Sequence, residues 1–272
     1  MVRIGPILYL DTSVNNLKKL AAITFLTLSL YLTENGYAQF NVEEQVDNSV
    51  RDTGGIYCGQ VIHTNITLTV NLICAGDGLI VGEDGITVNL DGHSVEGPSK
   101  NSGKVGIAIP HSNNVTIHGP GIIRYFQAGI LITGSIDAEI KNIKFEENKI
   151  GIFMVGSIET IVDKNDIRSN TIGVASHTSR GNNIHANVLI TNDLAGVTFK
   201  GTDNSRIDAN SIHGSEYGIF LDEDGSQNTI LNNTAMKNDI DINNADGLAV
   251  SENGNEFNNN KCNTSDPDGL CK

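Results

Sequence analysis

Three ionisable side chains of different chemistry recur at nearly equal spacing in the second half of the sequence. His177, Lys200 and Asp222 lie 23 and 22 residues apart. An imidazole, an ammonium group and a carboxylate that stand together can move protons to and from the sugar units of a polysaccharide. Such proton transfers are the chemistry of polysaccharide lyases, hydrolases and epimerases. These three residues are therefore the candidate catalytic residues.

A second set, Asp163, His185 and Asp208, recurs with spacings of 22 and 23 residues. Two carboxylates and one imidazole suit zinc or another divalent ion better than Cu(I), which prefers Cys or Met. His118 and Lys141 occupy the two preceding places of the same series. The alternative is a structural ladder, in which opposite charges on neighbouring strands attract each other.

An acidic turn is the third candidate site. It consists of Asp222, Glu223, Asp224 and Gly225, and Asp246 follows about one repeat later. Oxygen ligands of this kind suit calcium. The spacing of an EF-hand is missing, however, and an acidic turn on an acidic protein is normally solvated. We therefore predict no cofactor, with a divalent cation such as calcium as the alternative.

These spacings belong to a repeat that fills the middle of the sequence. Its start is marked at intervals of 22 or 23 residues by Gly106, Gly129, Gly151, Gly173, Gly196 and Gly218, with Asp241 in the next place. The residues one, three, eleven and sixteen places after the starts are almost all apolar, with Ser176 as an exception and a shift of one residue in the coil that begins at Gly218. The last column reads Ile122, Phe145, Ile167, Leu189 and Ile212, with Ala235 one residue later. A unit this short cannot bury its own apolar side, so neighbouring units must stack and share a core.

Asparagine recurs in the same register. Fourteen residues after the repeat start stand Asn165, Asn187 and Asn210, with Asn233 one residue later in its coil. Five residues further on stand Asn170, Asn192 and Asn238, and Asn253 and Asn258 continue the spacing. An Asn in a turn can bond through its amide to the coils above and below, so that stacked copies form a ladder.

The composition agrees with many short strands joined by tight turns. The chain contains 33 Asn, 33 Ile and 29 Gly but only 5 Pro and no Trp. Leucine-rich repeats would place Leu at the strand positions, and the calcium-binding β-roll needs Gly-Gly-x-Gly-x-Asp repeats, which are absent. We predict an all-β protein: a right-handed parallel β-helix of about eight coils of 22–23 residues, with three short strands per coil and an Asn ladder.

The repeat also predicts which outward side chains are neighbours. Phe153, Ala175, Thr198 and Phe220 each follow a repeat start by two residues. The two rings would stand at the ends of a floor of small residues, beside the candidate catalytic residues. Such a trough suits a sugar chain, because aromatic faces stack on sugar rings. These four are the candidate substrate-binding residues, and the alternative is that a loop or a second subunit covers both rings.

The first coils carry a family resemblance. Cys58-Gly59, Asn71-Leu72-Ile73-Cys74 and Val88-Asn89-Leu90-Asp91-Gly92-His93, followed by the repeat, resemble exported β-helix proteins of the pectin-lyase-like superfamily. Among these is the periplasmic copper-binding type of nitrous-oxide-reductase maturation. The resemblance implies the fold but no single activity, since the superfamily includes lyases, hydrolases, epimerases, adhesins and non-catalytic surface proteins. With 3 Met and no Met/His-rich tract, copper finds no ligand set in the sequence.

The N-terminus reads as a targeting segment. Basic residues precede the apolar run 20–32, which is too short to span a membrane but suits a signal peptide. Gly36 and Ala38 supply the small residues of a cleavage site after Ala38. We predict a signal peptide over 1–38, with an uncleaved anchor as the alternative. A linker or short cap over 39–57, irregular first coils over 58–105, regular repeats over 106–260 and a closing tail over 261–272 then follow.

Export has consequences for the four cysteines. In an oxidising compartment they are expected to form disulfides, and pairing of near neighbours, Cys58 with Cys74 and Cys262 with Cys271, is the simplest of three connectivities. Glycosylation sequons begin at Asn65, Asn114, Asn232 and Asn263, usable where the host glycosylates exported chains.

The charge excludes one class of partner. With 18 Lys and Arg against 32 Asp and Glu, the net charge is −14, which argues against nucleic-acid binding. We predict a secreted or cell-surface protein without a stable membrane span after cleavage. The leading function is non-catalytic binding of a polysaccharide or cell-surface partner. The alternatives are a carbohydrate-active enzyme and a structural or adhesin-type surface protein.

Overall fold

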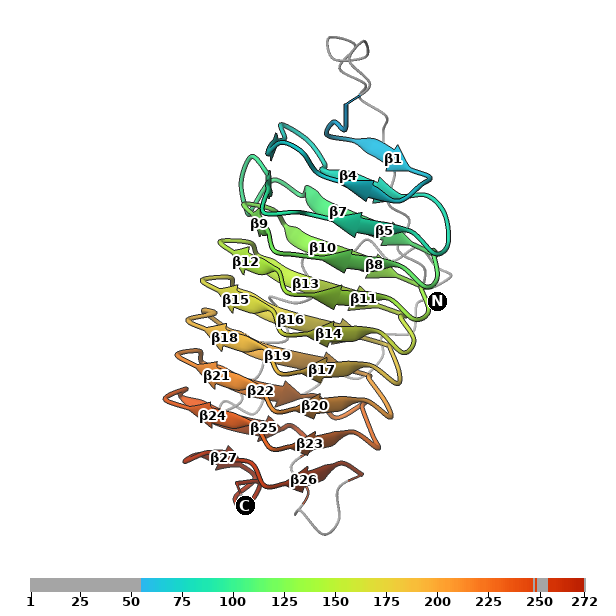
Figure 1. Ribbon diagram of the computed structural model, residues 1–272. Helices are drawn as coiled ribbons and strands as arrows, with labels where there is room; N and C mark the ends of the chain where they lie inside the picture. Colours follow the sequence, from blue (N-terminus) through green and yellow to red (C-terminus); the bar gives the residue numbers. More distant parts are fainter. Residues whose placement is uncertain (1–54, 247, 249–253, 272) are drawn as a thin grey trace, which may run out of the picture. The chain divides into compact units, whose positions relative to one another are not determined.

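The computed structural model describes residues 55–246, 248 and 254–271. The expected signal peptide over 1–38 lies outside these residues. Within them, every regular element is a strand, and the strands form three parallel sheets that wind about one axis as a parallel β-helix (Figure 1). The fold prediction is confirmed, although the solenoid has about nine coils rather than eight. The extra coil comes from the irregular first repeats, which form complete turns of their own.

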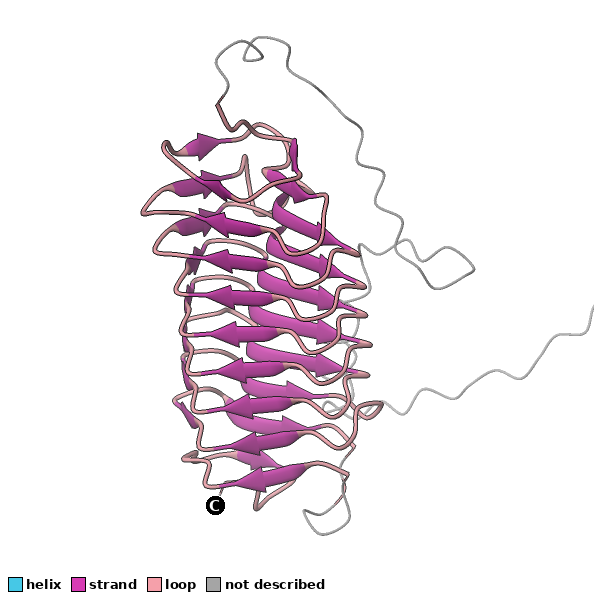
Figure 2. Cartoon of the chain, turned by 45° about the vertical axis from the view of Figure 1, so that its right-hand side comes forward, coloured by secondary structure: helices cyan, strands magenta, loops and turns pink. Residues whose placement is uncertain are grey.

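Each coil contributes one strand to each sheet, and Figure 2 shows the strands of successive coils stacked in register. The ten-stranded sheet contains β1 (Gln60–Ile62), β4 (Leu79–Val81), β7 (Val105–Pro110), β10 (Ala128–Thr133), β13 (Ile150–Val155), β16 (Ile172–His177), β19 (Ala195–Lys200), β22 (Tyr217–Leu221), β25 (Ile240–Asn244) and β27 (Ser265–Asp266). The nine-stranded sheet contains β2 (Ile66–Thr67), β5 (Thr87–Asn89), β8 (Thr116–His118), β11 (Glu139–Lys141), β14 (Ile161–Asp163), β17 (Asn183–His185), β20 (Arg206–Asp208), β23 (Thr229–Leu231) and β26 (Glu256–Asn258). The eight-stranded sheet contains β3 (Leu72–Ile73), β6 (Ser94–Glu96), β9 (Ile122–Arg124), β12 (Lys144–Glu146), β15 (Asp166–Arg168), β18 (Val188–Ile190), β21 (Ser211–His213) and β24 (Thr234–Met236).

The apolar columns of the repeat form the core. Ile107, Ile130 and Ile152 are ladder partners in the ten-stranded sheet, and all three are fully buried. One column of the prediction is shifted in its first coil, because Ile123, and not Ile122, pairs with Phe145. The turn after β8 holds one residue more than the equivalent turns, so Ile122 points outward and is partly exposed.

The Asn ladder is confirmed, and its bonds can be followed atom by atom. The backbone N–H and the side-chain amide of Asn165 both donate to Oδ1 of Asn187, at 2.9 and 3.0 Å. The side-chain amide of Asn187 in turn donates to the carbonyl oxygen of Val162 at 2.8 Å. The residue before each ladder Asn has a positive φ, as Ala186 does at 53°. Because that conformation is costly for a residue with a Cβ, the buried amide bonds offset strain at each turn.

At the last coils the ladder departs from the prediction. The backbone N–H of Asn233 donates to Oδ1 of Asn260 at 3.1 Å, so Asn260 takes the place expected for Asn253. Asn258 lies on the outer face of β26 and is exposed. The cause is an insertion, since 27 residues separate the two ladder positions there instead of 23. Asn253 lies outside the described residues.

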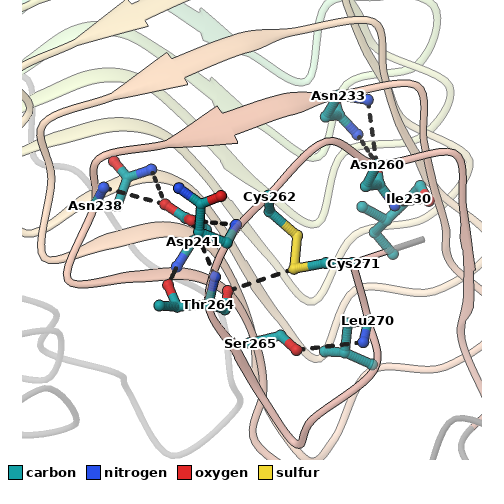
Figure 3. The surroundings of a disulfide bond; sticks show 11 residues. Ile230, Asn233, Asn238, Asp241, Asn260, Cys262, Thr264, Ser265, Leu270 and Cys271 are labelled. Atoms are coloured by element: carbon teal, nitrogen blue, oxygen red, sulfur yellow. Dashed lines mark hydrogen bonds between the residues drawn. A yellow bond between two sulfur atoms is a disulfide. The ribbon is translucent and has the colours of Figure 1, made fainter.

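Disulfides hold both ends of the solenoid. Cys58 is bonded to Cys74 and Cys262 to Cys271, which confirms the pairing of near neighbours. Figure 3 shows the second bond beside Asp241, whose carboxylate accepts from both nitrogens of Asn238 (3.1 and 3.0 Å) and from the backbone of the last strand connection. Leu270 is fully buried and closes this end of the core.

Candidate functional site

The outer face of the ten-stranded sheet differs from the other two outer faces. It carries apolar side chains that are at most 8% exposed and yet do not belong to the interior core: Ile80, Val105, Ala128, Leu131, Ile150, Phe153, Ile172, Ala175, Ala195 and Tyr217. On the nine- and eight-stranded sheets the outward positions are mostly polar or charged and partly exposed, as in β11 and β12. The ten-stranded sheet therefore has two apolar faces, one of which lies outside the core.

The repeat glycine creates this arrangement. A Cβ on Gly129 would lie 2.6 Å from the carbonyl oxygen of Gly151 and 2.9 Å from the ring of Phe145. Glycine allows the backbone to bend toward the core at this point. As a result, the side chain before the glycine points outward and the side chain after it points into the core. Ala128 belongs to the outer face, whereas Ile130 belongs to the core.

The four candidate substrate-binding residues are brought together as predicted by the register. Phe153 pairs with Ala175, Ala175 with Thr198, and Thr198 with Phe220. Phe153 is 8% exposed and Phe220 is partly exposed, and the ring of Phe220 lies 5.3 Å from that of Tyr217. The sequence analysis missed that the face extends to the residue before each repeat glycine. The signal was present, since that residue is apolar in every repeat from Val105 onward.

Buried polar atoms without a hydrogen-bond partner lie among these apolar side chains. Within the described part of the chain they are Nε2 of His177, Oγ1 of Thr198 and Oδ1 of Asn243, and all three residues are at least 92% buried. Such atoms are costly unless something bonds to them. Each of these three atoms is therefore buried as well as unpaired.

The candidate catalytic residues are neighbours along one side of the face. His177 is the ladder partner of Lys200, and Oδ1 of Asp222 accepts a hydrogen bond from the backbone N–H of Gly201 at 2.9 Å. Burial, with a smaller contribution from Lys200, lowers the pKa of His177 to about 4. Burial also raises the pKa of Asp222, and the N–H of Gly201 and the charge of Lys200 oppose that rise.

This arrangement limits the chemistry of the site. The strands of the ten-stranded sheet from β1 to β19 contain no Asp or Glu. Glycosidases need two carboxylates on either side of the bond that they cleave, and on this face the carboxylates lie at one end only, at Asp222, in the turn after it and at Asp266 beside Asn243. The neutral imidazole of His177 is a weak base because its pKa is low. His177, Lys200 and these carboxylates are ionisable groups that a proton transfer on this face would have to use.

The second candidate set is adjacent in the nine-stranded sheet but is engaged in ion pairs. Asp163 pairs with His185 and His185 with Asp208 in the ladder. The carboxylate of Asp163 contacts Lys164 at 2.8 Å, and that of Asp208 contacts Arg206 at 2.9 Å and His185 at 3.4 Å. Burial alone raises the pKa of Asp208, but hydrogen bonds, chiefly from Arg206, lower it overall.

Metal-binding clusters of hard ligands are absent from the part of the chain that the structure describes. No group of three or more His, Cys, Asp or Glu side chains there could hold a metal ion. In the acidic turn, Asp222 is turned to the backbone of Gly201, and Asp246 accepts from Asn244 and from the N–H of Leu248. These carboxylates bond to the chain itself.

A different pair of side chains meets on the outer face of the eight-stranded sheet. His213 and Met236 are ladder partners at the end of β21 and β24, and both are partly exposed. Nδ1 of His213 lies 3.0 Å from the carbonyl oxygen of Met236, and Nε2 lies 2.9 Å from Oγ of Ser211. The residues are separated by 23 positions in the sequence, so a search for a Met/His-rich tract does not find them.

Comparison with protein families identifies the chain. The sequence model of the periplasmic copper-binding protein (NosD) family matches residues 61–266, most of the chain. The chain belongs to this family. A search of curated proteins finds no matching relative. Among the described residues, no helix has the length and apolar character needed to cross a membrane.

Solved structures share the fold at low identity. A DFA-IIIase from Arthrobacter chlorophenolicus A6 aligns with a TM-score of 0.55 and 16% identity, over 71% of this chain and 53% of that one. The surface adhesin PfbA of Streptococcus pneumoniae gives 0.51 and 15%, over 76% and 77%. The Dettilon tailspike protein gives 0.52 and 17%, over 68% of this chain and 44% of that one. The chain thus spans about half of the enzyme and less than half of the tailspike, and the likeness concerns the fold.

The family description implies copper, and the available donor atoms decide which residues could hold it. All four cysteines are bonded in disulfides, so they offer no thiolate. Met154 is fully buried in the core. Met236 and His213 supply a thioether and an imidazole on adjacent strands, and both are ligands that suit Cu(I). In the structure, however, Nδ1 of His213 faces the carbonyl oxygen of Met236 and Nε2 faces the hydroxyl of Ser211, so both ring nitrogens are engaged.

Proposed function

We propose that this protein is exported and binds a polysaccharide along the outer face of the ten-stranded sheet, without cleaving it. The main support for the proposal is that polar atoms without a hydrogen-bond partner lie beside apolar rings on that face. Sugar rings need apolar surface for their C–H faces and hydrogen-bond partners for their hydroxyls. His177, Thr198 and Asn243 carry polar atoms that could bond to sugar hydroxyls, and the apolar side chains around them could contact the C–H faces.

Two further observations support this function. The fold is shared with a surface adhesin and a tailspike protein, which supports the proposal at the level of the fold. The family is described as periplasmic, in agreement with the predicted signal peptide and with both disulfides. Phe220 and Lys200 are partly exposed members of the face, and we expect a sugar chain to contact these residues first.

A glycan array followed by titration tests the proposal. The exported chain is screened against neutral and uronic-acid polysaccharides, and the best ligand is titrated into Phe220→Ala, Phe153→Ala and a control. Loss of a stacking ring should weaken binding by about 1 kcal/mol, and more at Phe220 because it is more exposed. Ile161→Ala is the matched control, since Ile161 is an outward apolar residue (40% exposed) on the nine-stranded sheet.

The outcomes separate binder, enzyme and structural protein. A ligand whose affinity falls in the Phe variants and not in Ile161→Ala supports the proposal. New reducing or unsaturated ends in the incubated polysaccharide would assign catalysis to the chain instead. Failure of every glycan to bind would leave a structural role and refute the proposal.

A further inference from the structure

The corner between β6 and β7 holds a longer connection than the equivalent corner of the next coil. The N–H of Gly97 donates to the carbonyl oxygen of Arg124 at 2.9 Å, and the N–H of Gln127 donates to the carbonyl oxygen of Lys104 at 2.8 Å. Two residues separate Arg124 from Gln127, but six separate Gly97 from Lys104. Residues 98–103, which we call the corner loop, therefore leave the path of the solenoid.

A long-range ion pair shows in which direction the corner loop points. Nζ of Lys100 lies 3.8 Å from Oδ2 of Asp193. Asp193 lies in the turn before β19, and the strands β10, β13 and β16 separate β19 from β7 in the ten-stranded sheet. These four strand spacings amount to about 19 Å. A loop of this length with an extended lysine side chain can cover that distance only by running along the corner toward the later coils.

The path of the corner loop follows one column of outward side chains. The column consists of successive ladder partners at the starts of five strands: Val105, Ala128, Ile150, Ile172 and Ala195. Each of them is at most 8% exposed, although none belongs to the interior core. Ile161, an outward apolar residue on β14 of the nine-stranded sheet, is 40% exposed. The column beside the corner loop is thus shielded, whereas an open sheet face is not.

We propose that the corner loop is a flap over this margin of the outer face, which the pair of Lys100 and Asp193 holds closed and which opens to admit a ligand. The two side chains are 40% and 68% exposed. An ion pair so exposed contributes little to stability and is weakened by salt, so the contact that closes the flap breaks readily. That the ligand is a sugar chain rests on the proposed function, whereas the flap itself does not.

The hydrogen bonds of the corner loop give it a fixed tip and a movable base. The N–H and the hydroxyl of Ser102 both donate to the carbonyl oxygen of Ser99, at 3.1 and 2.7 Å, so the tip is closed on itself. Gly103 has a φ of 74°, and nothing lies within 4 Å of the place where its Cβ would stand. Gly97 is confined instead, since a Cβ there would lie 2.6 Å from the ring of Phe126. We therefore expect the loop to move chiefly about Gly103.

A soluble paramagnetic probe tests the flap without any glycan, because the probe broadens the methyl NMR signals of exposed side chains. In Lys100→Gln and in Asp193→Asn, the broadening of Ile150 and Ile172 should increase about two- to fivefold, the range that the loss of an exposed ion pair allows. Raised salt should have the same effect on the unchanged protein, since the ions screen the pair.

Lys164→Gln is the matched control. Lys164 forms an exposed ion pair with Asp163 at 2.8 Å, but on the nine-stranded sheet. Its replacement should leave the signals of Ile150 and Ile172 unchanged. An equal increase in the control, or no increase in Lys100→Gln and Asp193→Asn, would overturn the proposal.

A cross-link connects the flap with binding. Free cysteines are absent from the described residues, so the double variant Lys100→Cys, Asp193→Cys can be joined by a photocleavable bis-maleimide. The glycan selected on the array should bind at least about tenfold more weakly to the cross-linked protein, in which the open state is not populated, and regain its affinity after photolysis. Affinity unchanged by the cross-link would refute the flap. If no glycan binds the unchanged protein, the proposed function fails, and the probe measurement alone decides on the flap.

Discussion

The imidazole of His177 meets the ring of Phe153 edge-on, with 5.0 Å between the ring centroids and 85° between the ring planes. This contact keeps His177 at 8% exposure on the outer face of the ten-stranded sheet. Burial lowers its pKa from 6.5 to about 4, with help from the charge of Lys200. At neutral pH the ring is therefore uncharged, and its Nε2 has no partner in the described residues.

The low pKa of His177 predicts a loss of stability in mild acid. The unfolded chain takes up this proton near pH 6.5, whereas the folded chain does so only near pH 4. Stability should therefore fall as the pH drops from 6.5 to 4, by about 3 kcal/mol in total, and stay level with respect to this group above and below.

Urea titrations of the unchanged protein and of His177→Gln over this pH range measure the effect. The variant should lose correspondingly less stability between pH 6.5 and 4. Asp222, whose pKa is raised, acts in the opposite direction but is present in both proteins, so it cancels in the difference. Identical pH profiles would show that His177 is not buried in the folded state.

The Asn ladder should contribute strongly to stability. Asn187→Ala removes the acceptor of two bonds from Asn165 and the donors to Val162 and Asn210. Because the remaining groups are buried, we expect a loss of about 2 kcal/mol or more.

Asn183→Ala is the control for the ladder. Asn183 lies in the same coil, but its side chain points outward from β17 and its oxygen has no partner. Its removal should change stability by about 0.5 kcal/mol or less. Equal losses in chemical denaturation would refute the role assigned to the ladder.

Substitutions at inward and outward positions of the nine-stranded sheet should also differ in their effect on stability. Ile184 is fully buried, and Ile184→Ala should cost about 2–5 kcal/mol. Asp163 points outward one coil earlier and pairs with an exposed lysine, so Asp163→Ala should cost less than about 1 kcal/mol. Unfolding midpoints in urea that coincide for the two variants would contradict the register.

The disulfides should act on the ends of the solenoid. Cys262 and Cys271 are 9 residues apart, and a loop this short constrains the unfolded chain by about 2–3 kcal/mol. Replacing both by Ser should lower the stability by that amount and speed hydrogen exchange in β25 and β27. Exchange that rises equally in β13, at the centre, would show that the bond stabilises the solenoid as a whole.

The sequence was sufficient for the fold because each coil repeats one apolar pattern. The column of Ile117, Ile140 and Val162 is in register as predicted. Prediction failed where the repeat length changes, by one residue before Ile122 and by four residues before Asn258, since residues added in a turn leave no mark in the strand pattern. The contact between His213 and Met236 follows from the same register, since the two residues are ladder partners 23 positions apart.

The candidate site was harder to predict than the fold. Periodicity named the neighbours Phe153 and Ala175 correctly. It could not show that Thr198 and Asn243 carry polar atoms without partners, because that depends on where each side chain finds a donor or acceptor. Nor could it give the low pKa of His177, which follows from burial.

The central claim is that a polysaccharide lies on the outer face of the ten-stranded sheet, and methyl NMR tests it most directly. The exported chain, labelled at Ile, Leu and Val methyl groups, is titrated with the glycan selected on the array. The signals of Leu131, Ile150 and Ile172 should shift, and that of Ile161 on the nine-stranded sheet should not. Shifts confined to Ile161, or a glycan that binds without moving any signal of the outer face, would contradict the account.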